Sequence, residues 1–239
     1  MSSIFYPAHE RGHVQFDWLD TYHSFSFGQY HDPTKIHFGA LRVLNDDKVD
    51  AGMGFGTHPH DNMEIITIPL FGDLHHRDST GRDCIIKEHD VQIMSAGSGI
   101  QHSEVNPNKD KRVELFQIWI FPKERNITPR YDQKSFLPED RVDQLLTVVS
   151  PNEPNTLFIN QDAWLSLGHF KKPFTTKYPM HQAGQGLFAI CIEGTCTVGG
   201  QVLGRRDAVG ISGVEAVQIE ATAGSDLLLI EIPHFTTGA

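Results

Sequence analysis

The 239-residue chain has little of what marks several large classes of protein. Its three cysteines, Cys84, Cys191 and Cys196, lack CxxC spacing, which favours reduced, buried thiols over a disulfide framework. Its longest apolar runs, residues 187–192 and 227–232, fall far short of the ~18 residues that a membrane helix needs. The first residues carry neither the charged nor the apolar region of a secretory signal. We therefore expect a cytoplasmic protein that does not enter a membrane.

Positive charge is also scarce. The chain has 20 Lys and Arg against 30 Asp and Glu, a formal net charge of −10, and no run of five basic residues. Because proteins that track nucleic-acid phosphates cluster basic side chains, this balance argues against direct nucleic-acid binding. What the chain does have is 15 Phe and 39% apolar residues, enough to exclude disorder and to build one large domain or two small ones.

Helical periodicity is scarce as well, whereas short β-rich runs recur between turn residues. Examples are residues 65–68, 84–86, 115–120 and 227–232. This pattern predicts an all-β fold. Residues 122–154 carry five prolines among charged residues and are predicted to be a connector, with one short helix or turn around residues 138–146.

The segments on either side of this connector resemble each other. In each, a β run ends at a glycine, Gly72 or Gly194, and a strand, a glycine-containing turn and further strands follow before a closing proline, Pro122 or Pro233. The second copy is the shorter one. We interpret this as a duplicated β-barrel and predict two domains, residues 1–130 and residues 131–239.

Two short motifs each place metal-ligating side chains on one face of a strand. His58 and His60 precede one β run, and His102 and Glu104 precede another. Residues i and i+2 of a strand point to the same side, so two such pairs on neighbouring strands would converge inside a barrel. Three imidazoles and a carboxylate suit Fe, Mn, Ni, Cu or Zn, and four protein ligands leave two positions of a six-coordinate ion open for chemistry.

Glu64 is an alternative fourth ligand. It has the same parity as His58 and His60, so it would also face inward if that strand ran unbroken. The spacing does not separate Glu64 from Glu104, and whichever carboxylate does not bind the ion would serve in proton handling or support the ligands.

The remaining histidines have simpler interpretations. The adjacent His75 and His76 point to opposite faces of a strand and are predicted to lie in a solvated hairpin. His23, between aromatic residues, is predicted to be a core or interface residue. The second half has a solitary His181 and no histidine between residues 206 and 233, so its barrel is expected to hold no metal.

The segments around the proposed ligands match the two cupin motifs. The first motif is matched, with one extra residue before its last glycine, by Gly52, His58, His60, Glu64 and Gly72. The second is matched, without its leading glycine and with Gly97 in place of the usual proline, by Gly99, His102 and Asn106. Within the cupins the chain resembles the pirin family, in particular its bacterial quercetinase-type members. The segments that carry this likeness are 10–12, 18–20, 23–27, 40–47, 57–60, 94–99 and 128–131.

The resemblance implies a two-barrel cupin, or bicupin, with one metal ion, usually iron, in the N-terminal barrel only. In pirins the fourth ligand is the glutamate two residues after the third histidine. The implied ligands are therefore His58, His60, His102 and Glu104, with Glu64 as a nearby carboxylate. Many family members have Arg-Gly-Phe after the second histidine, where this chain has Asp61-Asn62-Met63, which removes a positive charge beside the metal.

The function implied by the resemblance is that of a mononuclear metal-dependent dioxygenase similar to quercetin 2,3-dioxygenase, which opens a flavonol ring with O2 and releases CO. The ion, Fe(II) first and Zn, Mn, Ni or Cu as alternatives, would bind the substrate's deprotonated hydroxyl. Glu104, or Glu64 if Glu104 stays bound to the ion, would accept the hydroxyl proton. Phe27, Met53 and Phe55 would hold the flat apolar substrate.

A rival interpretation is a metal-dependent, redox-sensing regulator that binds a protein partner, as the nuclear pirins do. A third is another cupin reaction, such as a small-molecule isomerisation. The acidic charge balance means that the regulator would bind a protein rather than DNA. The width of the cavity beside the metal distinguishes a flavonol-cleaving enzyme from another cupin reaction, and partner capture with metal-loaded and metal-free protein distinguishes it from the regulator.

Overall fold

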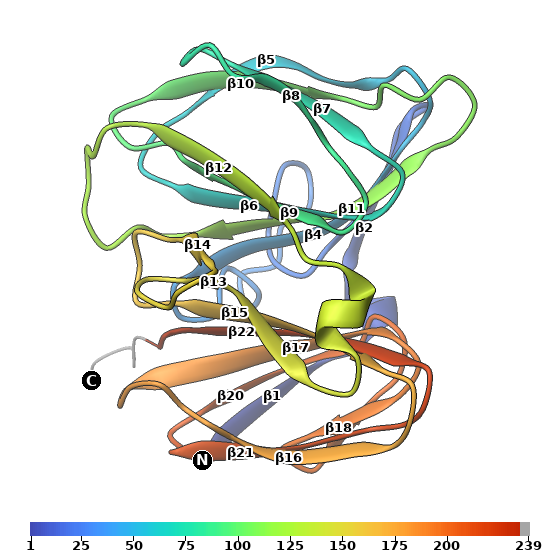
Figure 1. Ribbon diagram of the computed structural model, residues 1–239, viewed down its shortest axis with the longest axis vertical. Helices are drawn as coiled ribbons and strands as arrows, with labels where there is room; N and C mark the ends of the chain where they lie inside the picture. Colours follow the sequence, from blue (N-terminus) through green and yellow to red (C-terminus); the bar gives the residue numbers. More distant parts are fainter. Residues whose placement is uncertain (235–239) are drawn as a thin grey trace.

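The computed structural model describes residues 1–234, and its architecture is two β-barrels stacked one on the other (Figure 1). Regular structure in the described residues is strand apart from two short 3-10 helices, η1 (Ala8–Glu10) and η2 (Pro138–Arg141). Each barrel is built from one seven-stranded and one four-stranded sheet. The predicted all-β class with two barrels is confirmed.

The first barrel contains the two histidine motifs. Its large sheet has the order β12-β9-β6-β11-β4-β3-β2, formed by Arg130–Ser135, Asp90–Ser95, Glu64–Phe71, Val113–Ile120, Leu41–Val49, Leu19–His23 and Gly12–Gln15. Its small sheet has the order β5-β10-β7-β8, formed by Gly54–His60, Ile100–Val105, Leu74–Asp78 and Asp83–Ile86.

The second barrel repeats this plan. Its large sheet has the order β1-β20-β17-β22-β15-β13-β14, formed by Ser2–Tyr6, Ala208–Ser212, Gln185–Glu193, Ser225–Pro233, Trp164–Phe170, Leu145–Ser150 and Leu157–Phe158. Its small sheet has the order β16-β21-β18-β19, formed by Phe174–Pro179, Ala216–Ala221, Cys196–Val198 and Gln201–Leu203. The two sheet orders correspond, as a duplication requires, except at one edge, where β14 follows β13 and pairs with it in parallel whereas β2 precedes β3 and pairs with it antiparallel.

The two barrels exchange edge strands. The N-terminal strand β1 pairs with β20 of the second barrel, whereas β12, which precedes the second unit in the chain, pairs with β9 of the first. The sheets therefore do not divide the chain at residue 130, because residues 2–6 belong to the second barrel and residues 130–135 to the first. The segment predicted to be a connector contains β12 and the start of the second barrel, and within it only Pro138–Arg141 is helical.

The two large sheets pack against each other and form one core between the barrels. Along β11, residues alternate between two buried faces: Phe116, Ile118 and Ile120 face this shared core, while Val113 and Leu115 face the interior of the first barrel. On the other side, Leu228 and Ile230 of β22 belong to the shared core and Leu227 to the interior of the second barrel. A strand buried on both faces needs a nearly continuous apolar sequence, and residues 115–120 and 227–232 provide one, interrupted only by Gln117 and Glu231.

The interiors of the two barrels are filled differently. One continuous apolar cluster fills the second barrel, including Phe170, Leu187, Val209 and Leu229. The first barrel instead has two small apolar clusters, one around Leu74 and Leu115 and the other around Ile65 and Met94. The polar side chains of the candidate site lie in the first barrel, where the apolar core is divided.

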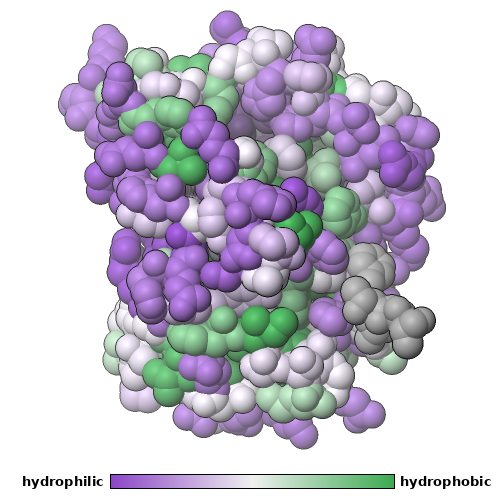
Figure 2. Space-filling model, turned by 180° about the vertical axis from the view of Figure 1, so that it is seen from behind, coloured by the Kyte–Doolittle hydropathy of each residue, from purple (hydrophilic) through white to green (hydrophobic). Residues whose placement is uncertain are grey.

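The outer surface is largely polar over the first barrel. Figure 2 shows hydrophilic residues predominating there and more hydrophobic and neutral residues on the second barrel. In the described part of the chain, no helix has the length and apolarity to cross a membrane. Cys191 and Cys196 are buried and Cys84 is partly buried, and all three are free thiols, as the spacing predicted.

The shared core is expected to carry a large part of the stability. Phe188 is fully buried there and packs its ring against Tyr6, Phe25 and Phe38. Phe188→Ala should lower the free energy of unfolding, measured by urea denaturation, by about 3–5 kcal/mol. Phe16→Ala, at a side chain that is 46% exposed, is the matched control and should cost far less. Equal losses of unfolding free energy in the two variants would contradict the expectation that the shared core carries a large part of the stability.

Candidate metal centre

Three imidazoles meet inside the first barrel. His58 and His60 lie on β5, and His102 lies on the neighbouring strand β10, directly opposite His58 in the register. The Nε2 atoms of His58 and His102 are 3.0 Å apart, and one ligand nitrogen from each ring lies within 4.8 Å of the others. The structure thus brings together the three histidines that the i, i+2 spacing selected.

Glycines allow these two strands to approach. A Cβ atom on Gly54 would lie 2.2 Å from the carbonyl oxygen of Glu104, so only glycine fits at this position of β5. Gly97 and Gly99, in the turn that leads into β10, have φ angles of +48° and +132°, which side chains disfavour. The glycine-rich segments around the histidines are therefore requirements of the local backbone.

Two of the three imidazoles have a lowered pKa, which favours the neutral form that can bind a metal ion. Burial and the neighbouring imidazoles lower the pKa of His102 to about 2, and burial together with His58 lowers the pKa of His60 to about 4. The Nδ1 atom of His58 lies 2.8 Å from the carbonyl oxygen of Gly56, which can only accept, so Nδ1 donates its N–H there and Nε2 is the atom that faces His102. Two facing Nε2 atoms at 3.0 Å suit a cation between them, and the nitrogen-rich set fits a divalent transition metal.

Glu104 is buried beside these rings, two residues after His102, with a β-bulge between them. Its carboxylate accepts hydrogen bonds from Gln117 Nε2 at 2.8 Å and from the Thr67 hydroxyl at 3.4 Å. Burial raises the pKa of Glu104, although His76 and His58 oppose the shift. One carboxylate oxygen of Glu104 and one ring nitrogen each of His76 and His102 lie within 4.8 Å of one another. Glu104 therefore adjoins the imidazole triad through His102.

His76 corrects a prediction made from the sequence. The adjacent pair His75 and His76 was predicted to be a solvated hairpin, but His76 is completely buried on β7, opposite Glu104 of β10. Its Nε2 is 2.9 Å from Asp78 Oδ2, and its Nδ1 has no hydrogen-bond partner. Only His75 faces outward, where it pairs with Asp83 at 2.6 Å. The signal was the parity of His76 with Leu74, a buried residue of the same strand.

Glu64 does not join the imidazoles, because the strand that carries His58 and His60 does not run on to it. β5 ends at His60, Asn62 has a φ of +45°, and Glu64 begins β6 in the other sheet. Its carboxylate there accepts hydrogen bonds from the Ser95 hydroxyl at 2.8 Å and from the backbone N–H of Asn160 at 3.1 Å. Burial raises the pKa of Glu64 in this position. The hydrogen bond from Asn160 links Glu64 of the first barrel to the second barrel.

A cavity of about 220 Å³ opens beside the triad. His58, His60 and Glu104 line it together with aromatic side chains, among them Phe27, Phe55 and Trp119. Phe27 and Phe55 are thus where the sequence placed them, whereas Met53 is 43% exposed and is not part of the lining. His23 also lines the cavity, and its Nδ1 is 2.7 Å from Asn45 Oδ1, so it is a buried, hydrogen-bonded side chain, as expected of a core histidine.

Asp47 is a lining residue that motif reasoning did not find. It lies on β4, whose alternation turns Asp46 toward Arg206 of the second barrel and Asp47 toward the cavity. Burial is the main cause that raises the pKa of Asp47 to about 7, and the negative charges of Asp46 and Glu104 add to it, while a hydrogen bond from the Thr21 hydroxyl opposes it. A carboxyl group with this pKa can exchange a proton near neutral pH.

The corresponding region of the second barrel carries different side chains. Strand β21, which corresponds to β10, has the sequence Ala-Val-Gln-Ile-Glu-Ala and carries no histidine. His181 is bound through Nδ1 to the buried Glu231 at 2.7 Å and stacks on Trp164. Tyr178 donates a second hydrogen bond to Glu231 at 2.8 Å, so the buried carboxylate is paired within the cluster.

Comparison with known proteins places both halves in one family. Residues 6–120 match the family described as Pirin, and residues 147–232 match the Quercetinase C-terminal cupin domain. The chain is 42% identical over 229 residues to quercetin 2,3-dioxygenase of Escherichia coli K12, covering 95% of this chain and 96% of the relative. It also matches the crystal structure of YhhW from E. coli, with a TM-score of 0.93 and 39% identity over 99% of this chain and 100% of that one. A second YhhW structure, a bacterial pirin in complex with nickel(II), matches with a TM-score of 0.92 and 39% identity, covering 98% and 100% of the two chains.

The raised pKa of Asp47 predicts a pH-dependent stability of the metal-free protein. The carboxyl pKa is about 7 in the folded state and about 4 in an unfolded chain. The folded state therefore binds the proton more tightly, and this contribution to the free energy of unfolding is lost as pH rises from about 4 to about 7. Urea denaturation across this range should show a loss on the order of 4 kcal/mol that Asp47→Asn removes. The exposed Asp110→Asn is the control, and an unchanged profile in Asp47→Asn would refute the assignment.

Proposed function

Because the chain belongs to the pirin family, as its motifs predicted, we propose that it is a metal-dependent dioxygenase that opens a flavonol ring with O2 and releases CO. The observation that carries the proposal is a triad of converging imidazoles, with His102 buried and His58 and His60 half-buried, beside an aromatic-lined cavity. The name of the E. coli relative supports a flavonol as substrate. The rival function, regulation through a protein partner, would use the same triad but has no need of this cavity.

We assign one divalent transition-metal ion to His58, His60, His102 and Glu104. The imidazole triad supplies the nitrogen donors, and Glu104 adjoins it through His102. Such an ion would act as a Lewis acid toward the flavonol hydroxyl and would hold O2 close to it. Fe(II) is the first candidate from the sequence, and the nickel(II) complex of YhhW supports nickel as a second. Zn, Mn and Cu suit the same donors.

The aromatic lining would select flat apolar substrates. Phe27 packs edge-on against Trp119 with ring centroids 5.2 Å apart, and Trp119 is likewise edge-on to His60 at 4.8 Å. These rings form a rigid wall that leads to the triad. The cavity of about 220 Å³ is smaller than the roughly 300–1,000 Å³ typical of pockets for drug-sized ligands. A three-ring flavonol would therefore extend into the cavity mouth or widen the cavity as it binds.

Two carboxyl groups line this cavity and could accept the hydroxyl proton. Glu104 is assigned to the ion, which leaves Asp47 as the free acceptor, with a pKa of about 7 in the absence of the ion. A divalent cation nearby would favour the ionised, proton-accepting form of Asp47. Glu64, the other candidate from the sequence, is engaged by Ser95 and Asn160 outside the cavity lining, so we assign it a positioning role between the barrels.

Loss of one imidazole should abolish metal binding. His60→Ala is expected to lose most of the bound metal, measured by elemental analysis of freshly purified protein, while its circular dichroism stays that of a β protein, because folding rests on the apolar strands. His75→Ala is the matched control, since this histidine is on the same barrel but pairs outside with Asp83. A stoichiometric metal content in His60→Ala would remove His60 from the ligand set.

Activity separates the roles of the two carboxyl groups. With the flavonol quercetin and Fe(II), Mn(II), Ni(II), Cu(II) or Zn(II) loading, the protein should consume O2 and release CO with at least one metal. Asp47→Asn should keep its metal and slow the reaction by about 100-fold or more, the usual contribution of a general base. Glu104→Gln should lose metal as well as activity. An absence of O2 uptake with every metal would contradict the proposed function.

A cytoplasmic location of the protein stays a prediction from the sequence.

A further inference from the structure

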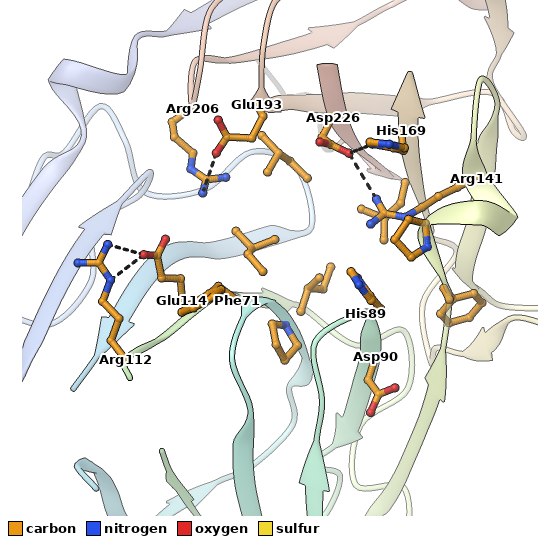
Figure 3. A pocket seen from close by; sticks show the side chains of 17 residues that line it. Phe71, His89, Asp90, Arg112, Glu114, Arg141, His169, Glu193, Arg206 and Asp226 are labelled. Atoms are coloured by element: carbon orange, nitrogen blue, oxygen red, sulfur yellow. Dashed lines mark hydrogen bonds and ion pairs between the residues drawn. The ribbon is translucent and has the colours of Figure 1, made fainter. Parts of the chain in front are cut away.

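A second, larger cavity lies between the two barrels, away from the imidazole triad (Figure 3). Its volume is about 560 Å³, within the range of small-molecule sites. Both halves of the chain contribute to its lining: Ile68 and Glu114 come from the first barrel, Leu167 and Arg206 from the second, and Arg141 from η2. The cavity is therefore a product of the way the barrels pack.

The same sheet separates the two cavities. On β6, Thr67 bonds Glu104 on the triad side while its neighbour Ile68 lines the cavity between the barrels. On β11, Gln117 lines the first cavity and Glu114 the second. Alternation along a strand sends successive residues to opposite faces, so the two cavities lie back to back and share no lining residue.

Apolar side chains make up much of the wall of this second cavity. The first barrel supplies Ile68 and Leu70, the second supplies Leu167 and Ile192, and Phe136 lies in the segment that joins them. A molecule bound here would bury an apolar body against these side chains.

Two guanidinium groups in this cavity have donors without acceptors. Arg206 is 4% exposed; its Nε lies 3.2 Å from Asp46 Oδ2, but its Nη1 has no hydrogen-bond partner. Arg141 has an unpartnered, buried Nε, and its Nη1 is 3.9 Å from Asp226, beyond hydrogen-bond distance. Figure 3 shows both guanidinium groups directed toward the space between the barrels. An unpaired donor on a buried cation is costly, so an acceptor at these positions would be strongly favoured.

The acidic side chains of the cavity are, by contrast, already engaged. Arg112 holds Glu114 through two contacts, at 2.7 and 2.6 Å, and His169 contacts Asp226 at 2.9 Å. Asp90 accepts from the Ser135 hydroxyl and the backbone N–H of Lys87, and Glu193 accepts from Arg205 at 2.9 and 3.0 Å. Among the buried polar side-chain atoms of this lining, those without a hydrogen-bond partner belong to Arg141 and Arg206.

From these contacts we infer that the cavity between the barrels binds a small organic anion, an apolar body that carries a carboxylate or a phosphate group. The anionic group would accept hydrogen bonds from the unpartnered N–H groups of Arg206 or Arg141, and the apolar body of the ligand would pack against Leu167 and Ile192. Bidentate acceptance is the geometry that guanidinium groups favour with both kinds of anion. The site is separate from the metal centre, and its ligand need not be the substrate.

The test is isothermal titration calorimetry of the metal-loaded protein with three probes that share one apolar body: 2-naphthoate, 2-naphthyl phosphate and the neutral 2-naphthamide. At least one anion should bind about tenfold or more tightly than the amide, and the preferred anion identifies the head group. Arg141→Gln and Arg206→Gln should each weaken that binding by about tenfold or more. Arg77→Gln is the matched control, because Arg77 pairs with Asp83 at 2.8 Å and neither residue lines the cavity. Arg206 also pairs with Asp46, so Arg141→Gln decides the result if Arg206→Gln does not fold.

Removal of the metal separates this site from the first. Binding of the anion should be the same in metal-depleted protein, and the bromine signal of 6-bromo-2-naphthoate in a crystal should lie between the barrels. Three results would overturn the inference: equal affinity for the amide and both anions, unchanged anion affinity in Arg141→Gln and Arg206→Gln, or loss of binding when the metal is removed.

Discussion

The face-to-face packing of two large sheets is the interaction on which the rest of the molecule depends. The central strands of each sheet are buried on both sides, against the interior of their own barrel and against the neighbouring barrel, so most of their residues are apolar. Alternation along the strand then decides which of the two sides each polar residue faces. Asp46 and Asp47 illustrate it, since adjacent carboxyl groups reach an arginine of the second barrel and the cavity of the first.

The two barrels differ in the side chains that fill their interiors. A continuous apolar cluster occupies the interior of the second barrel, and its buried Glu231 is paired with His181 and Tyr178. In the first barrel the apolar residues divide into two clusters, and imidazoles and carboxyl groups occupy the remaining interior. Buried polar groups without full partners are costly, and in the first barrel two of them, His102 Nδ1 and His76 Nδ1, are imidazole nitrogens. The gathering of imidazoles, rather than unpaired polar atoms in general, distinguishes the first barrel from the second.

The sequence predicted the fold class, the duplication and the imidazole triad, because each depends on local spacing. Parity on a strand is enough to bring His58 and His60 to one side, and a neighbouring strand brings His102. The same parity argument predicted that Glu64 would face inward with His58 and His60. Parity applies only within one continuous strand, and the turn at residues 61–63 separates Glu64 from the strand of the two histidines. His76 and Asp47 were missed because the sequence does not show which face of a strand is buried when both neighbours are polar. The cavity between the barrels could not be foreseen, since its lining is set by how two separately folded sheets meet.

The exchange of β1 and β12 also sets the order in which the chain can complete itself. Ala8 donates its backbone N–H to Asp207, 199 residues later, and Ile4 pairs with Gly210. On a ribosome β1 is thus made long before β20, the strand with which it pairs, and Ile4 and Phe5, still exposed in the finished fold, remain in water until β20 has been made. The first barrel has no such delay, because its own edge strand, β12, follows directly after it. The barrel that carries the imidazole triad can therefore close during synthesis, whereas the second barrel is completed only when β1 pairs with β20.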